Sequence, residues 1–374
     1  MQSQVVSRLR PELADHDLDA IVCISPENVA YTAGFVVPSQ PLMRWRHAMT
    51  VIDGEGRTAV VCVDMEETTV RNTLGDTETE VRVWREFIDH RMSALVGLLR
   101  DWGHGDGRVG IELDYLPVSD HDYLLENLPE LRLVEADSLL QAARRIKTPR
   151  EIALLEQLSR ISDTAIRDAF DSVSAGSTEM DLAATLTRRV YEQGAQQFKL
   201  MIVATGERSQ LPNVGPTTRV LEPGDICRVE IFSVIDGYHA GVCRTAVVGE
   251  PSPIAEQVYA NLVQCKHEVF AAMKPGASSR EIYELFSATF RALGMPAISF
   301  VAHSIGVNLH EPPYFGPHSD QPVAPGMVLA MEPLVYQSGH GFGMQIKDMI
   351  AIEDDGARLL SDVTDTDHLY RIRA

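Results

Sequence analysis

Short, continuous apolar runs alternate with longer amphipathic stretches over the first third of the chain. Apolar runs rich in Val and Ile are typical of buried strands, whereas apolar residues three and four apart predict helices. The runs that predict strands are 18–24, 48–52, 58–63 and 108–112. The stretches that predict helices are 3–16, 64–73 and 87–102. This alternation predicts an α/β domain, which we expect to occupy residues 1–140.

The rest of the chain begins with a helix start signal and continues with longer elements. Thr148, Pro149 and Glu151 have the spacing of a capping box with proline in the first turn. Asp236-Gly237 between two apolar runs predicts a β-hairpin. The expected helices are 151–174, 179–193, 254–273 and 279–293, and the expected hairpin strands are 226–234 and 238–248. We expect a second domain over residues 141–374.

Two histidines in the last third of the chain open the stretch that carries candidate chemistry. His303 and His310 are seven residues apart, with Gly306 between them. The glycine favours an extended or turning segment over one face of a helix. An imidazole changes its charge near neutral pH, so His303 is a candidate for proton transfer.

Two predicted strands follow and bring charged side chains to the same place. The apolar run 328–331 ends at Glu332, and a second strand over 344–352 would lie beside it and point Lys347 inward. A carboxylate and an ammonium would therefore lie beside the imidazole of His303. These are the groups that acid–base chemistry requires.

Composition narrows the classes of function. The chain has 374 residues, of which 45% are hydrophobic, so two domains with sizeable cores are expected. The net charge of −20 argues against nucleic acid and anionic membrane surfaces as partners, and no window of 18 apolar residues predicts a membrane span. Five cysteines without CxxC spacing, and no apolar run in the first ten residues, lead us to expect a cytoplasmic protein.

Motifs across nearly the whole chain resemble one family. The order His-x-x-Gly-x-x-x-His-Glu-x-Pro from His303, followed by Met-Glu-Pro around Glu332, resembles the pita-bread hydrolases, which include aminopeptidase P, prolidase, methionine aminopeptidase and creatinase. The segment 25–35 is similar to the start of their N-terminal domain, and 145–152 to their interdomain linker. The resemblance implies an α/β (α+β) fold, in which an N-terminal creatinase-like α/β domain is followed by a C-terminal pita-bread catalytic domain.

The chain departs from this family at the metal ligands. The peptidases hold two divalent metals with two Asp, one His and two Glu. By motif position these ligands fall on Glu230, Gly241, His303, Glu332 and Lys347. Glycine has no ligand atom and a protonated lysine is a poor ligand. We therefore expect no metal and no other cofactor, with the ammonium of Lys347 offsetting the remaining carboxylates. The alternative is a single metal ion bound by Glu230, His303 and Glu332.

Creatinase, a metal-free member of the family, offers a partial parallel. Phe232 looks like creatinase, whereas the peptidases usually have Gly at this position. The catalytic His of creatinase falls on Asn213, which cannot carry a proton at neutral pH, and its Glu falls on Cys243. The creatine-cleaving set is therefore incomplete.

The candidate residues fall into two groups. The catalytic candidates are Glu230, His303, Glu332, Lys347 and Cys243. The substrate-binding candidates are His310, His239, Arg244, Asn213, Phe232, Arg44 and Arg46. His303 and Glu332 would form an acid–base pair. Cys243, beside Arg244, is either a nucleophile or a small core residue, and His239 is either a substrate contact or a structural histidine.

The segment 43–47, Met-Arg-Trp-Arg-His, is basic and aromatic. In creatinase-like dimers a loop at this location reaches the partner's active site, where an arginine suits a substrate carboxylate. The resemblance thus implies a homodimer, and the alternative for the segment is a solvated turn.

These observations lead us to expect a metal-independent hydrolase of a C–N bond in a small, carboxylate-bearing amidine, guanidino or cyclic-amide compound, similar to creatinase or ectoine hydrolase. Two alternatives stay open. One is a metal-dependent Xaa-Pro dipeptidase or aminopeptidase with a reduced site, and the other is a catalytically silent dimer that only binds a ligand. Retention of His303 and Glu332 favours an enzyme, whereas loss of both bridging ligands favours the silent protein.

Overall fold

The computed structural model describes residues 3–296 and 298–374, and the chain divides into two compact units, Met1–Arg144 and Arg145–Ala374. The expected boundary after residue 140 falls inside helix α6 (Asp137–Arg145), most of which therefore belongs to the first unit. In the described part of the chain, no helix is both long and apolar enough to cross a membrane.

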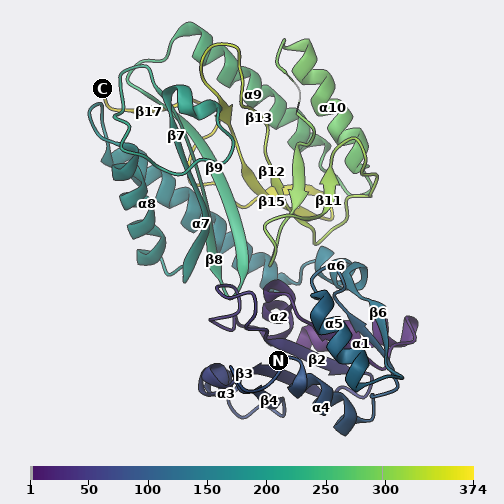
Figure 1. Ribbon diagram of the computed structural model, residues 1–374. Coiled ribbons are helices and arrows are strands. Elements are labelled where there is room, and N and C mark those ends of the chain that lie inside the picture. Colours follow the sequence, from purple (N-terminus) through teal and green to yellow (C-terminus); the bar gives the residue numbers. More distant parts are fainter. Residues whose placement is uncertain (1–2, 297) are drawn as a thin grey trace. The chain divides into compact units, whose positions relative to one another are not determined.

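The first unit is built on a six-stranded sheet in the order β4-β3-β2-β1-β5-β6 (Figure 1). Its strands are β1 (Ala20–Cys23), β2 (Met49–Asp53), β3 (Thr58–Val63), β4 (Glu80–Trp84), β5 (Arg108–Ile111) and β6 (Arg132–Glu135). Its other helices are α1 (Ser3–Asp15), α2 (Pro26–Ala33), η1 (Asp64–Glu66), α3 (Glu67–Leu74), α4 (Ser93–Trp102) and α5 (Val118–Asn127). Nearly every residue of β1, β2 and β3 is buried, as expected for strands covered on both faces. The predicted α/β class is confirmed.

One predicted helix of this unit begins later than expected. We predict a helix from residue 87, but α4 begins at Ser93. Phe87 has a φ of 64°, in the left-handed region that a bulky side chain rarely adopts. The carboxylate of Asp89 accepts hydrogen bonds from the backbone N–H and the guanidinium of Arg85, which closes this segment into a loop. The prediction is therefore wrong before Ser93.

The second unit contains two larger sheets, with the orders β17-β9-β8-β7 and β11-β10-β12-β15-β16, and a small sheet of β13 and β14 (Figure 1). The first of these sheets contains β7 (Gln197–Thr205), β8 (Ile226–Ile235), β9 (Tyr238–Val248) and β17 (Tyr370–Ile372). The others are β10 (Ala302–Ser304), β11 (Glu311–Phe315), β12 (Val328–Met331), β13 (Leu334–Val335), β14 (Met344–Gln345), β15 (Asp348–Glu353) and β16 (Gly356–Leu359). The helices are α7 (Pro149–Ser172), α8 (Glu179–Glu192), η2 (Gly206–Gln210), α9 (Pro253–Ala272) and α10 (Ser279–Ala292).

Two local signals in the sequence of this unit are confirmed. The hydroxyl of Thr148 accepts from the backbone N–H of Glu151, whose carboxylate accepts in return, so α7 starts with the predicted capping box. Asp236 and Gly237 have φ of 50° and 84° and join β8 to β9. Positive φ at both central residues is what a two-residue hairpin of this type requires.

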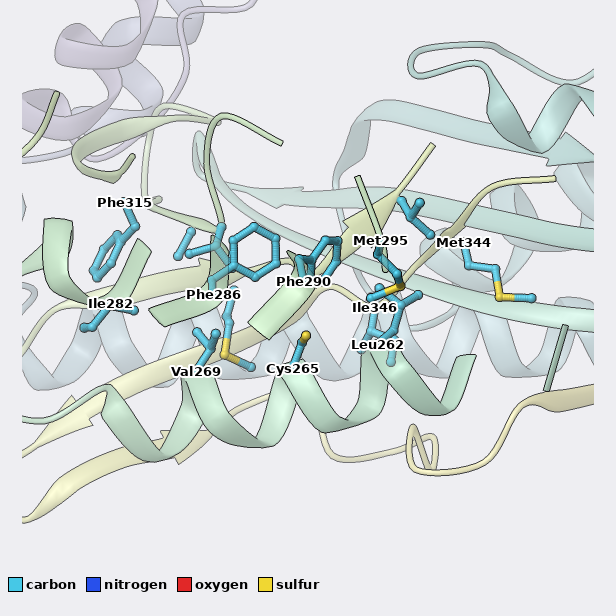
Figure 2. Close-up of a cluster of buried hydrophobic side chains, with 14 of the residues drawn as sticks. Leu262, Cys265, Val269, Ile282, Phe286, Phe290, Met295, Phe315, Met344 and Ile346 are labelled. Carbon is cyan, nitrogen blue, oxygen red and sulfur yellow. The ribbon is translucent and has the colours of Figure 1, made fainter. Parts of the chain in front are cut away.

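Aliphatic, aromatic and sulfur-containing side chains form the core under α9 and α10 (Figure 2). Leu262, Cys265 and Val269 are spaced for one face of α9, and the rings of Phe286 and Phe290 on α10 lie 4.3 Å apart. Burial of one such phenylalanine contributes about 1.5–3 kcal/mol. Because β10, β12 and β14 also contribute side chains to this core, it holds in place the strands that carry the site described next.

The predicted strand over 344–352 is two strands, so this prediction is wrong. β14 pairs with β13 and β15 pairs with β12, and Ile346 and Lys347 lie between them. The backbone of Lys347 instead exchanges two hydrogen bonds with Cys243 of β9, at 3.1 and 3.2 Å. This bridge joins the chain between β14 and β15 to the sheet that contains β8 and β9.

Candidate active site

Four of the predicted catalytic side chains meet inside the second unit. Glu230 lies on β8, His303 on β10, Glu332 directly after β12 and Lys347 between β14 and β15. The ammonium nitrogen of Lys347 lies 3.0 Å from a carboxylate oxygen of Glu230 and 3.2 Å from Oε2 of Glu332. All four side chains are buried. The structure therefore brings together the imidazole, carboxylates and ammonium that the motifs indicate.

The two carboxylates control the charge of Lys347. Burial lowers the pKa of Lys347, but Glu230 and then Glu332 outweigh burial and hold the pKa above its ordinary value. Burial raises the pKa of Glu332, while Lys347 and His303 together lower it below its ordinary value. Lys347 is therefore an ammonium and Glu332 a carboxylate near neutral pH.

The second oxygen of Glu332 faces His303 in an unusual arrangement. Nε2 of His303 lies 3.2 Å from Oε1 of Glu332, yet neither buried atom has a hydrogen-bond partner of suitable geometry among the described residues. Nδ1 of His303 lies 2.8 Å from the carbonyl oxygen of Ser304, which can only accept, so Nδ1 carries a proton. In the neutral ring Nε2 is then an acceptor facing an acceptor. A proton or a cation between these two atoms would relieve that repulsion.

His310 stacks on His303, with ring centroids 3.7 Å apart and an angle of 17° between the planes. Partial burial, followed by the nearby His303 and Lys347, lowers the pKa of His310 to about 4, so this imidazole is neutral at neutral pH. Donor atoms of His303, His310 and Glu332 lie within 4.8 Å of one another. Neutral imidazoles and carboxylates are ligands for divalent transition metals, so these three residues are candidate metal ligands.

His239 lies on β9 and contacts the turn between the two site histidines. Its backbone N–H donates to the carbonyl of Gly306 at 2.8 Å. Burial, followed by Lys199, lowers the pKa of His239 to about 4, and its Nδ1 has no hydrogen-bond partner among the described residues. Its predicted contact with substrate stays a prediction, as does that of Asn213, which is exposed in the loop after η2.

A buried polar relay that we did not predict supports Glu332. The guanidinium of Arg228 donates to Oε1 of Gln345 at 3.0 Å, and Nε2 of Gln345 donates to Oε2 of Glu332 at 3.0 Å. Because Arg228 can only donate, it orients the Gln345 amide so that Nε2 points at the carboxylate. Arg228 precedes Glu230 by two residues on β8 and so lies on the same face, which is the signal that could have identified it.

Arg228 also anchors the loop that carries Asn213. It donates to the carbonyls of Ser209, Leu211 and Pro212, and its guanidinium lies 5.2 Å from the ring centroid of Tyr336. One buried cation thus satisfies three carbonyls, one from η2 and two from the loop that follows it. This ties the loop to the same relay that orients Glu332.

Two predicted site residues on β9, Arg244 and Cys243, are buried and contact other parts of the protein. Arg244 is buried and donates to both oxygens of Asp163, at 3.0 and 2.9 Å, and lies 2.9 Å from Asp348. Its guanidinium is a structural cross-link and does not bind a substrate from this position. Cys243 is fully buried, and burial followed by Glu230 raises the pKa of its thiol well above the ordinary value. The thiolate of a nucleophile is therefore disfavoured, and Cys243 is part of the core.

Phe232 and Gly241 face each other across the hairpin. The two residues are register partners on β8 and β9, and a Cβ added to Gly241 would lie 2.2 Å from Cε1 of Phe232. The same ring lies 4.6 Å from the ammonium nitrogen of Lys347, which is the distance of a cation–π contact. Phe232 therefore occupies the space into which a side chain at 241 would project, rather than an open substrate surface.

The basic segment 43–47 lies in the first unit, and its two arginines differ. Arg46 donates to both oxygens of Glu86, at 2.8 and 2.7 Å, and His47 lies 2.9 Å from Asp120. Arg44 and its neighbour Trp45 are exposed. Arg46 is thus engaged within its own unit, and Arg44 is the arginine of this segment that is available to a ligand.

Comparison with known proteins identifies both parts of the chain. The metallopeptidase family M24 matches residues 153–354, and the creatinase/prolidase N-terminal domain matches residues 6–146. A Xaa-Pro dipeptidase of Pyrococcus furiosus is 27% identical over 238 residues, covering 63% of this chain and 68% of the relative. An uncharacterised peptidase of Bacillus subtilis is 27% identical over 361 residues, covering 95% and 97%.

Solved structures share the fold over nearly the whole chain. An X-Pro aminopeptidase of Thermotoga maritima has a TM-score of 0.85 at 21% identity, covering 98% of this chain and 99% of that protein. A Xaa-Pro dipeptidase of Bacillus anthracis has a TM-score of 0.85 at 23% identity, with the same coverage. These likenesses confirm a creatinase-like domain followed by a pita-bread domain.

The comparisons also correct the function expected from the sequence. We expected a metal-independent hydrolase of an amidine, guanidino or cyclic-amide compound. The matching family is one of metallopeptidases, and three relatives are named Xaa-Pro dipeptidases, which contradicts that expectation and favours the peptidase alternative. Since the match from 153 to 354 spans more than half of the 374 residues, the chain belongs to the metallopeptidase family M24.

Proposed function

We propose that this chain is a metal-loaded hydrolase that cleaves the C–N bond preceding proline in dipeptide-sized substrates. The names of its relatives support the substrate class. The observation that carries the proposal is the buried pair of atoms Nε2 of His303 and Oε1 of Glu332, which face each other at 3.2 Å without a hydrogen bond. Two buried acceptors aimed at one point form half of a metal site.

The residues present fit a single cation. His303 and Glu332 would hold it, and His310 would complete a set of three donors. When bound, a divalent cation supplies Lewis-acid polarisation of the scissile carbonyl. The set that two cations would need is incomplete, because Gly241 and Lys347 stand at two of the five ligand positions.

The chain's own side chains prepare this site. Gln345 donates to Oε2 of Glu332 and Lys347 forms an ion pair with the same oxygen, which keeps the group ionised and leaves Oε1 directed at His303. The hydrogen bond from Nδ1 of His303 to the carbonyl of Ser304 fixes the ring and its tautomer. Ligands held in place before the metal binds lose less freedom when it does, so binding is favoured.

We also propose a homodimer in which the segment 43–47 of one subunit contributes to the site of the other. A dipeptide carries a carboxylate at its end, and an arginine binds a carboxylate through two parallel hydrogen bonds. The exposed Arg44 is suited to this role, because Arg46 is paired with Glu86.

A second candidate is a catalytically silent protein that binds peptides on the same scaffold. It is favoured by the ion pairs of Lys347 with Glu230 and Glu332. In these pairs two carboxylates at the family's metal-ligand positions bind the lysine of the protein itself. This candidate predicts peptide binding without cleavage.

Incubation of the purified protein with Xaa-Pro dipeptides and with the same dipeptides carrying alanine for proline separates the two candidates. The assay is run after removal of metal and again after addition of Mn²⁺, Co²⁺ or Zn²⁺. We expect proline-selective, metal-stimulated release of free proline that Glu332→Gln abolishes. Binding of Xaa-Pro peptides without release of proline under every metal would support the silent protein instead.

A further inference from the structure

We propose that this site holds one divalent cation and not two, and that Lys347 sets this number. The proposal rests on the metal-loaded hydrolase proposed above and specifies its metal content. The described residues provide a position for one ion, between His303 and Glu332, and fill the neighbouring position with protein atoms.

The distance between the two facing acceptors suits one ion. Nitrogen and oxygen ligands lie about 2.1 Å from a transition-metal ion, so two adjacent ligands are about 3.0 Å apart in octahedral and about 3.4 Å apart in tetrahedral coordination. Nε2 of His303 and Oε1 of Glu332 lie 3.2 Å apart, between these values. His310 is close enough to supply a third donor.

The neighbouring position is filled by an ammonium and a ring. Nζ of Lys347 lies between Glu230 and Oε2 of Glu332, at 3.0 and 3.2 Å. Phe232 covers the ammonium at 4.6 Å and leaves no space for a side chain at Gly241, where a Cβ would be 2.2 Å from the ring. An added carboxylate ligand has no room, and the existing carboxylates already bind a cation that belongs to the protein.

The net charge of the site also favours one divalent cation over two. Glu230, Glu332 and Lys347 together carry a charge of −1 when all three are ionised. One dication brings the site to +1, which the carboxylate of one dipeptide can neutralise. Two dications would bring it to +3 in a buried site, where like charges repel strongly. The positive charge of Lys347 is therefore the feature that limits the number of ions.

Metal stoichiometry tests this proposal without a substrate. The full-length protein is stripped with a chelator and titrated calorimetrically with Zn²⁺, Mn²⁺ or Co²⁺, and the ions retained after desalting are counted by elemental analysis. We expect one ion per chain. His303→Asn and Glu332→Gln should each weaken binding roughly 10-fold or more, because second-shell changes alone cost 10- to 100-fold. His310→Ala should weaken it less.

Variants at position 347 test the limiting role of the lysine. Lys347→Arg keeps the charge and should keep one ion per chain. Lys347→Glu removes the ammonium and adds a ligand, and we expect a second ion to bind. Combining Lys347→Glu with Phe232→Gly and Gly241→Asp makes room for the remaining ligand and should give two ions. Circular dichroism checks that each variant is folded.

Two ions on the parent protein, or none at saturating metal, would overturn the proposal whatever the variants do. A folded Lys347→Glu protein with unchanged stoichiometry would show that the lysine does not set the number. If one ion binds as expected but no Xaa-Pro dipeptide is cleaved, the one-cation site stands and only the proposed activity fails.

Discussion

Replacing Lys347 with methionine should destabilise the second unit by about 3–5 kcal/mol in the absence of metal, which is the usual cost of removing one partner of a buried ion pair. The ammonium lies 3.0 Å from Glu230 and 3.2 Å from Glu332, and no side chain of the three is more than 6% exposed. Methionine has a similar volume, so the substitution leaves little cavity. It leaves two buried carboxylates close together with no cation between them.

The positions of the tryptophans determine how this prediction is measured. Trp45, Trp84 and Trp102 all lie in the first unit, so tryptophan fluorescence reports on that unit and serves as an internal control. Hydrogen exchange, followed by mass spectrometry of peptides from β8, β12 and β15, reports on the second unit. A loss of about 3–5 kcal/mol corresponds to exchange about 100-fold to several thousand-fold faster at the most protected amides.

A paired variant separates the charge effect from packing. In Lys347→Met combined with Glu230→Gln, one of the two buried charges is gone, so the double variant should be more stable than Lys347→Met alone. The reasoning fails if Lys347→Met exchanges within about tenfold of the parent, which is a loss of less than about 1.4 kcal/mol. It also fails if the double variant is the less stable of the two.

Three further predictions follow from contacts away from the ammonium. Gln345→Leu removes a donor to Glu332 and should lower zinc affinity roughly 10-fold, and unchanged affinity by calorimetry would count against the relay. Asp120→Asn should cost about 2 kcal/mol at pH 7, because Asp120 pairs with His47 and Arg91. Burial raises the pKa of Asp120, but these partners lower it overall, so its stabilisation is lost as pH falls below about 4 and fluorescence-monitored unfolding of parent and variant should converge. Mixing Arg44→Ala with Glu332→Gln subunits should restore activity through one intact hybrid site, and verified heterodimers without activity would place the 43–47 segment elsewhere.

Local signals in the sequence predicted the fold where the structure depends on neighbouring residues. The turn at Asp236-Gly237 and the cap at Thr148 are set by a few adjacent residues, and both appear as predicted. The prediction of one continuous strand over 344–352 is wrong because the pairing of this segment depends on strands far away in the sequence. Residues before Ile346 pair with β13 and those after Lys347 pair with β12, and an apolar pattern does not specify that change of partner.

The candidate site was also predicted only in part, where the signal lies in the local sequence. Motif spacing identified His303, Glu332 and Lys347, which the structure brings together. The environment of Cys243 depends on total burial and on Glu230, which adjacency to an arginine in the sequence does not reveal. Arg228 was missed because a charged residue in a strand is usually solvent-facing, whereas its partners come from one distant loop and from Gln345.

Membership of a metallopeptidase family and a lysine at a ligand position would conflict if Glu332 could bind only one cation. In the structure the two oxygens of this carboxylate have different surroundings. Oε2 is saturated by Lys347 and Gln345, whereas Oε1 faces Nε2 of His303 and has no hydrogen-bond partner among the described residues. A lysine that engaged both oxygens would leave no ligand atom for a metal, whereas Lys347 engages a single oxygen and so is compatible with the proposed one-cation site. The fold therefore identifies the family, whereas the activity of this chain depends on the atoms around Glu332.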